Sequence, residues 1–243
     1  VTRAVMEKLE KYIPIVKFIA SIMGENCEVL LHDVRNPENS IVAIENGHIS
    51  GRRVGGVLTD LVLKIVRNKE YQNQDFIANY VVVAKDNRIC QSSSLLIRDD
   101  NGEIIGVLCV NIDISTLLAT QKYLNEFIKI KPPNNLKNTL SIKASSDEEV
   151  EEISSEENEV LEHLLETSGD VVELLIGKVL NKFTIPVERM SQDEKIQVVR
   201  ELNELGLFLF KGGVSELAKK LKVSDATVYR YLHKIKDDDE KRL

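Results

Sequence analysis

The segment "VSELAKKLKVSDATVYRYL" (214–232) constrains this chain more than any other stretch, because it specifies two short helices and the turn between them. Leu217, Ala218 and Leu221 lie on one face of a first helix. Ser224 is an N-cap residue for a second helix. Ala218 supplies the small side chain that two steeply crossing helices need where they touch. The pattern predicts a helix-turn-helix, with helices at about 192–205, 214–221 and 225–236.

The second helix of this segment has an apolar and a polar face. Val228, Leu232 and Ile235 are spaced to face inward, with Tyr231 half-buried beside them. The polar face suits a helix inserted into the DNA major groove, where Arg230 could make a bidentate contact with guanine. The candidate DNA-contacting residues are Ser224, Asp225, Thr227, Tyr229, Arg230, His233 and Lys234 on this helix, and Lys219, Lys220 and Lys222 before it. Asp225 serves either capping or the selection of cytosine, and a hairpin that only packs remains the alternative.

The distribution of charge matters more here than its sum. The net charge of −7 alone argues against a nucleic-acid binder. However, residues 144–177 hold twelve acidic residues and no Lys or Arg, whereas residues 211–236 hold seven basic and two acidic residues. The C-terminal block is therefore basic, and the acidity lies elsewhere.

The first half of the chain has the pattern of an α+β domain. A helix is expected over 8–23, stopped by Gly24, with Pro14 marking an alternative start. A second helix is expected over 57–68. Strands are expected at 27–34, 40–49, 77–86, 88–99 and 103–114, with turn residues between them. Their order and size fit a sensor domain with an antiparallel sheet and a helix across one face.

Two further helices are expected around an acidic linker. Residues 131–158 combine tandem prolines with an acidic run and cannot support a core, so we expect a solvated hinge there. Before it, a helix over 116–130 either forms a dimer or packs on the sheet. After it, a helix over 159–181 is expected, and "SQDE" at 191–194 is a capping-box pattern. The predicted domains are 1–130, a linker at 131–158, and a helical region at 159–243.

Catalytic and metal chemistry find little support. Cys27, Cys90 and Cys109 form no CxxC pair. His32 and Asp33 are neighbours on a strand, so they point to opposite faces. The serines at 92–94 lack the setting of a nucleophile elbow, and "GRRVGG" lacks the end of a P-loop. We expect no enzyme, no cofactor and no metal site. Without an apolar run long enough to cross a bilayer, we expect a cytoplasmic protein with no membrane partner.

Two stretches resemble known domains. "LLHDVRNPENSIVAIENGHISGR", "LTDL", "NYVVVAKDNRICQSSSLLI" and "GVLCVNID" resemble the YheO-like PAS domain. The segment from "VERMSQDEK" to "VYRYL" resembles the helix-turn-helix domain that follows it in YheO/DauR-type transcriptional regulators. The resemblance implies a PAS-like α+β sensor domain followed by an all-α helix-turn-helix domain. It also implies a dimer that responds to a ligand or signal.

The resemblance also marks polar residues of the sensor. Those taken as ligand-binding are His32, Asp33, Asn46, His48, Arg52, Asn79, Tyr80, Ser93 and Asn111. The same pattern marks Thr59, Asp60, Ser92 and Asp113. His32, Asp33 and Arg52 would suit a small zwitterion or organic anion. The alternative is that these residues are hydrogen-bonding groups of turns and strand ends.

The sequence thus predicts a regulator that binds double-stranded DNA as a homodimer and responds to a small-molecule effector or a partner. The alternative keeps the PAS-like domain but makes it a protein-interaction adaptor, with a helical C-terminus that does not bind DNA.

Overall fold

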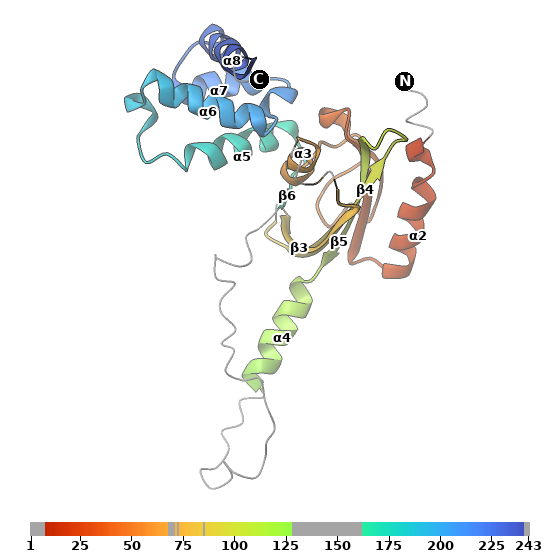
Figure 1. Ribbon diagram of the computed structural model, residues 1–243. Coiled ribbons are helices and arrows are strands. Elements are labelled where there is room, and N and C mark those ends of the chain that lie inside the picture. Colours follow the sequence, from red (N-terminus) through yellow and green to blue (C-terminus); the bar gives the residue numbers. More distant parts are fainter. Residues whose placement is uncertain (1–7, 68–70, 72, 85, 128–161, 241–243) are drawn as a thin grey trace, which may run out of the picture.

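The structure is a computed structural model that describes residues 8–67, 71, 73–84, 86–127 and 162–240. It has two parts (Figure 1). A six-stranded sheet with its helices forms one part, here called the sheet domain, and the helices after residue 167 form the other, called the helical region. The linker expected at 131–158 lies outside the described residues. Among the described residues, no helix has the length and apolarity needed to span a membrane.

The sheet confirms the five expected strands and adds a sixth. Its strands lie in the order β2-β1-β5-β4-β3-β6. All neighbours are antiparallel except β3 and β6, which are parallel. The strands are β1 (Cys27–Asp33), β2 (Ile41–Glu45), β3 (Phe76–Ala84), β4 (Ile89–Arg98), β5 (Ile104–Asp113) and β6 (Glu162–Leu164).

Helices cover both faces of this sheet. On the outer face, α2 (Ile13–Met23) packs Val16 and Ala20 against strand residues such as Val29 and Leu31. Its start beside Pro14 agrees with the alternative start expected from the sequence. On the inner face, α3 (Asp60–Arg67) buries most of its side chains. Because β1 is covered on both sides, every one of its residues is buried.

The helical region contains four helices of eight or more residues among the described residues. They are α5 (Ser168–Leu180), α6 (Gln192–Glu204), α7 (Gly213–Leu221) and α8 (Asp225–Glu240). The predicted capping box of α6 is confirmed, since the Ser191 hydroxyl accepts from the backbone N–H of Glu194 and the Glu194 carboxylate accepts from that of Ser191. The short helices η3 (Val187–Arg189) and η4 (Leu207–Leu209) flank α6.

The expected helix over 159–181 is wrong in its first part. Residues 162–164 form β6, which pairs with β3 and places the fully buried Leu164 in the core. The helix begins at Ser168, because Thr167 and Asp170 form a capping box there. Apolar spacing over so short a stretch fits a strand and a helix equally well. The strand forms because the edge of β3 offers unpaired backbone groups.

The helix α4 (Ser115–Phe127) stands apart from the rest of the fold. It projects away from the end of β5 (Figure 1), and none of its residues is buried. Of the two alternatives for this helix, packing on the sheet is therefore wrong for a single chain, and the dimer stays a prediction. Residues 128–130 of the expected helix lie outside the described residues.

Candidate DNA interface and sensor site

The helix-turn-helix is built by α7 and α8. At the turn, Lys222 adopts a left-handed conformation with φ 53°, and the N–H of Val223 bonds to the carbonyl of Ala218. The Ser224 hydroxyl then accepts from the Thr227 N–H at 3.2 Å and caps α8, as predicted. The turn therefore satisfies the backbone groups at the end of one helix and the start of the next.

The packed face of this motif follows the predicted register with one exception. Leu217, Ala218, Leu221 and Val228 are buried, and so is Ile235. Tyr231, expected to be half-buried, is 5 % exposed, whereas Leu232 is the half-buried residue of the pair. An aromatic ring fills more of the space between α8 and the other helices than a leucine side chain does, so the ring takes the inner position.

The outer face of α8 carries the predicted candidate residues. Tyr229 is 56 % exposed, and Arg230, His233 and Lys234 are exposed around it. The Arg230 guanidinium carbon lies 5.9 Å from the centre of the Tyr231 ring, a cation–π contact that orients the side chain. Tyr229, Arg230 and His233 therefore share an accessible surface on one helix.

Asp225 has a structural partner that the sequence did not reveal. The Ser215 hydroxyl of α7 donates to the Asp225 carboxylate at 2.6 Å. Asp225 is also the first residue of α8, where a negative charge favours the positive end of the helix dipole. The bond ties the two helices of the motif together, which accounts for an acidic residue at this position.

The four candidate lysines all have carboxylate partners. Lys219 lies 2.6 Å from Glu216, and Lys222 lies 2.6 Å from Glu188. Lys220 and Lys234 lie 3.9 Å from Glu173 and Asp193, respectively. Exposed pairs of this kind contribute little to stability, so a phosphate group could take the place of each carboxylate.

In the sheet domain, a buried ion pair forms the centre of a polar cluster. The Arg52 guanidinium lies 2.5 Å from the Glu28 carboxylate, and both side chains are almost completely buried. Ser50 donates to the other oxygen of Glu28, and Asn111 donates to Glu28 at 2.9 Å. Ser92 in turn donates to Asn111 at 2.5 Å. The network gives the buried charges the hydrogen bonds that they need.

Two members of this cluster, Ser50 and Glu28, were not among the predicted residues, and the more important of them is the charged Glu28. It alternates with Leu30 and His32 on the inner face of β1, so its period-two spacing was a usable signal. Arg52 and Asn111, by contrast, were both among the predicted ligand-binding residues.

His32 lies fully buried on the same inner face. Its Nδ1 is 2.8 Å from the Ser40 hydroxyl, while Nε2 has no hydrogen-bond partner in the described part of the chain. Burial, with a smaller effect from the nearby Arg52 charge, lowers the pKa of His32 to about 3. The imidazole is therefore neutral across the physiological pH range.

This burial predicts a stability change in acid. The unfolded chain takes up a proton on His32 near its ordinary pKa of 6.5, and the native chain does not until about 3. His32 therefore contributes stability above 6.5 that is lost as pH falls, at about 1.4 kcal/mol per pH unit. Urea unfolding at a series of pH values should show that the free energy of unfolding falls less steeply below pH 6.5 for His32→Asn than for the wild type. The same pH dependence of the free energy of unfolding in both proteins would contradict the burial of a neutral imidazole.

Several of the other predicted ligand-binding residues make separate local contacts. Asp33 pairs with Arg35, and the Asn46 amide donates to the carbonyls of Gly24 and Cys27. The Asn79 backbone N–H donates to Ser93, and these two residues lie at the irregular part of the β3–β4 pair. Tyr80 bonds to Ser94 at 2.7 Å inside the sheet domain.

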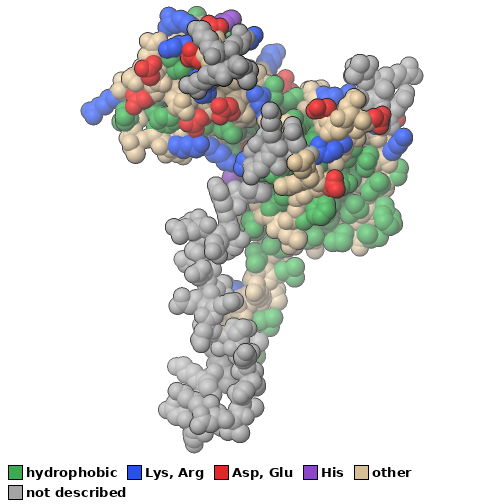
Figure 2. All heavy atoms as spheres, viewed as in Figure 1, with side chains coloured by type: hydrophobic (Ala, Val, Ile, Leu, Met, Phe, Trp, Pro, Cys, Tyr) green, Lys and Arg blue, Asp and Glu red, His purple; other side chains and the backbone are tan. Residues whose placement is uncertain are grey.

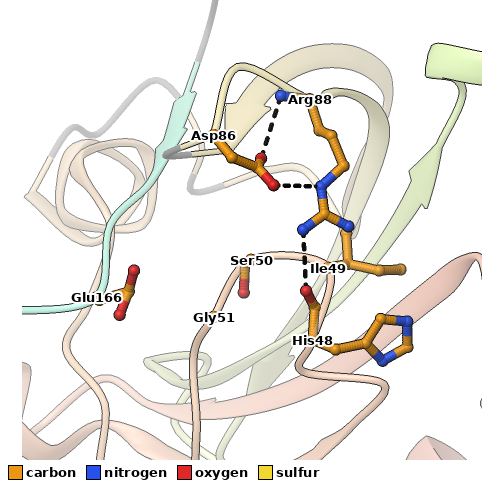
Figure 3. A pocket seen from close by; sticks show the side chains of 7 residues that line it. All are labelled: His48, Ile49, Ser50, Gly51, Asp86, Arg88 and Glu166. Carbon is orange, nitrogen blue, oxygen red and sulfur yellow. Dashed lines mark hydrogen bonds and ion pairs between the residues drawn. The ribbon is translucent and has the colours of Figure 1, made fainter.

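One cavity of about 220 Å³ lies beside the buried cluster (Figure 3). Residues 48–51 form one wall, and the β3–β4 turn contributes Asp86 and Arg88. Glu166, on the connection from β6 to α5, closes the side opposite Ser50 and Gly51. The Arg88 guanidinium donates to Asp86 at 2.6 Å and to the His48 carbonyl at 3.0 Å. The cavity is therefore charged, and it touches the segment that leads to the helical region.

The sheet domain and the helical region are joined at Asp60. Its carboxylate lies 2.5 Å from the ammonium of Lys178 on α5, and it accepts from the backbone N–H of His163 on β6 at 3.1 Å. Burial alone would raise the pKa of Asp60, but its bonds to His163 and Lys178 outweigh burial and lower it. A continuous apolar core runs from the sheet through α3 into the helical region. The two parts therefore pack as one body.

The comparisons with known proteins agree with both parts. Residues 3–129 match the family of YheO-like PAS domains, and residues 171–233 match a family of HTH domains. A protein of Haemophilus influenzae is 28 % identical over 232 residues, covering 96 % of this chain and 93 % of that one. The protein YheO of Escherichia coli is 26 % identical over 238 residues, covering 95 % and 86 %.

A third relative has a name that states a function in transcription. The transcriptional regulator DauR of Pseudomonas aeruginosa is 24 % identical over 233 residues, covering 94 % of this chain and 95 % of that one. The fold agrees with the matches, since an α+β PAS-like domain precedes an all-helical region with an HTH domain. Because the PAS match alone spans more than half of the chain, the protein belongs to the family with a YheO-like PAS domain.

Proposed function

We propose that this protein is a DNA-binding transcriptional regulator whose sheet domain senses a small molecule. The exposed face of α8 carries the proposal, because Tyr229, Arg230 and His233 stand on a helix that a buried helix-turn-helix core holds in place. The name of the relative DauR supports a regulatory role. The proposed domains are a sensor at 1–130, a linker at 131–158 and the DNA-binding region at 159–243, with β6 joined to the sensor sheet.

The proposed DNA contacts divide by chemistry. Arg230 and Thr227 on α8 read base edges, and Tyr229 and His233 contact bases or phosphates beside them. Lys219, Lys220, Lys222 and Lys234 bind phosphates, and Ser224 and Asp225 set the start of the reading helix.

Replacing Arg230 tests base reading. Arg230→Ala should weaken binding to the preferred duplex by about 1–3 kcal/mol and leave binding to random duplex nearly unchanged, because a bidentate contact with guanine is lost. Fluorescence anisotropy with both duplexes measures the difference. Lys219→Ala is the matched control, since losing a phosphate contact should weaken both complexes alike and lower the salt slope by about 1. Equal losses for Arg230→Ala on both duplexes would remove its assigned role.

The cavity of Figure 3 is the proposed effector site of the sensor. His48 lines it, and Arg52 and Asn111 lie in the buried cluster that Ser50 connects to it. We favour a regulator over an enzyme because the serine hydroxyls that could act as nucleophiles are held in hydrogen bonds within the sheet domain. Ser92 donates to Asn111, and Ser94 is hydrogen-bonded to Tyr80. The alternative adaptor function predicts no salt-dependent duplex affinity. Since the relatives are bacterial, we place the protein in the cytoplasm, where bacterial DNA lies.

We also propose that the protein is a homodimer. Hydrophobic side chains gather on the visible face of the sheet domain (Figure 2). In the same domain, Phe18 and Ile22 of α2 are each 64 % exposed. On α4, Leu117 is 65 % and Phe127 is 77 % exposed, although a single chain gains nothing by presenting them to water. Two copies bound to two half-sites of DNA would require an interface of this kind.

Substitutions on α4 test this dimer. Leu117→Glu with Leu124→Glu should give a monomer in analytical ultracentrifugation, because both side chains lie on the apolar face of an exposed helix. The control is Ala119→Glu with Asn125→Glu, which makes the same change of charge away from that face. A wild-type protein that sediments as a monomer at micromolar concentration would remove the dimer from the proposal.

A further inference from the structure

A second cleft, of about 390 Å³, lies between the sheet domain and the helical region. Lys64 and Arg67 of α3 form one wall. Lys182, just after α5, and Glu201, Glu204 and Leu205 at the end of α6 form the other. Lys64 and Arg67 follow Asp60 along α3, and Lys182 follows Lys178 after α5. Its size falls in the ordinary range of small-molecule sites, about 300–1,000 Å³.

Arg67 reaches this cleft across the end of α6. A Cβ atom added at Gly206 would lie 3.2 Å from the Arg67 Cδ atom, so the arginine stem runs closely over that glycine. Gly206 has a φ of +88°, the left-handed conformation that ends a helix. The absence of a side chain at 206 therefore lets a residue of the sheet domain place its guanidinium against the helical region.

The charges of the cleft are only partly paired. Lys182 donates to Glu201 at 3.0 Å. Within the described part of the chain, the side chains of Lys64, Arg67 and Glu204 show no hydrogen bond or ion pair. Two positive groups on one wall and one negative group on the other thus remain available to a ligand.

We propose that this cleft binds a small amino dicarboxylic acid. Its two carboxylates would meet Lys64 and Arg67, and its ammonium group would meet Glu204. A dicarboxylate without the ammonium group would place a negative ligand beside the Glu204 carboxylate. A diamine would place positive groups beside Lys64 and Arg67. The site is separate from the sensor cavity of Figure 3 and goes beyond the proposed function. A ligand here would join α3 to α6 and add a further tie between the two parts of the chain.

The experiment uses the full chain with L-glutamate and L-aspartate as probes. The matched compounds are succinate, which lacks the ammonium group, and glycine, which lacks one carboxylate. Thermal shift should show a Tm increase of about 3 °C or more with at least one amino dicarboxylate well above its Kd. Calorimetry should then show at least about tenfold weaker binding of succinate and glycine, as expected when one charge-assisted contact is lost.

Variants locate the ligand. Arg67→Gln and Glu204→Gln should each weaken binding of the amino dicarboxylate about tenfold or more, whereas Lys17→Gln and Glu126→Gln, both exposed and distant in the fold, should not. Failure of both probes would overturn the proposal. So would unchanged binding in the two cleft variants, or binding lost through Asp86→Asn in the sensor cavity instead.

Duplex affinity of the same preparations separates this inference from the proposed function. Intact DNA binding with no ligand binding would contradict only the proposed ligand site in the cleft. The opposite outcome is a protein without duplex affinity whose ligand binding depends on Arg67 and Glu204. It would support the ligand site in the cleft and contradict the proposed function as a DNA-binding regulator.

Discussion

Replacing Arg52 by methionine is expected to lower the free energy of unfolding by about 3–5 kcal/mol. The substitution keeps much of the side-chain volume but leaves the Glu28 carboxylate, which is 0 % exposed, without its cation. Ser50 and Asn111 would still donate to that carboxylate, but two neutral donors do not replace a buried guanidinium. Urea unfolding followed by circular dichroism measures the loss.

The double substitution Arg52→Met with Glu28→Gln is the control. It removes the charge that the single substitution leaves unpaired, so it should recover most of the lost stability. Glutamine at 28 keeps an oxygen that can accept from Ser50 or Asn111. A single variant that loses less than about 1 kcal/mol, or a double variant as unstable as the single one, would contradict a buried ion pair at the centre of the cluster.

The second large effect is expected at the junction. Asp60→Asn should weaken the attachment of the helical region by about 1–2 kcal/mol, a value discounted because the Lys178 side chain is 40 % exposed. The amide oxygen can still accept from the His163 N–H, so β6 should loosen rather than detach. Hydrogen exchange should show faster exchange at β6 (Glu162–Leu164) and at the start of α5, with little change at β1.

The junction should also respond to acid. The pKa of Asp60 lies below its ordinary value, so its contribution is fully present above that value and is lost as pH falls through the lowered pKa. The acid-dependent loosening of β6 should disappear in Asp60→Asn. Lys182→Met removes an exposed pair nearby and should leave exchange at β6 unchanged. Uniformly faster exchange across the whole sheet in Asp60→Asn would mean that Asp60 supports the sheet domain rather than the junction.

Most of the helices and strands could be predicted from local sequence patterns. Strand-forming segments bounded by turn residues located five of the six strands. Ser191 and Ser224 located two helix starts, because a cap acts on backbone groups only a few residues away. The helix-turn-helix could be predicted for the same reason. Its small residue, its turn and its cap all lie within a few residues of one another.

The long-range contacts could not be predicted in this way. Glu28 and Arg52 are 24 residues apart, and Asp60 and Lys178 are 118 apart, so no spacing rule connects them. The strand β6 has three residues and exists only because the edge of β3 is available to it. The predicted ligand-binding residues were read from a linear pattern, and the sheet separates several of them onto opposite faces.

Selection of duplexes from a random library, followed by affinity measurements at several salt concentrations, tests the central claim most directly. A regulator that reads DNA with α8 should enrich a defined sequence and bind it about 10³-fold or more tightly than random duplex. The logarithm of its affinity should fall linearly with the logarithm of the salt concentration, because its lysines displace counterions from phosphates. No enriched sequence, together with no duplex affinity at low salt, would contradict the claim.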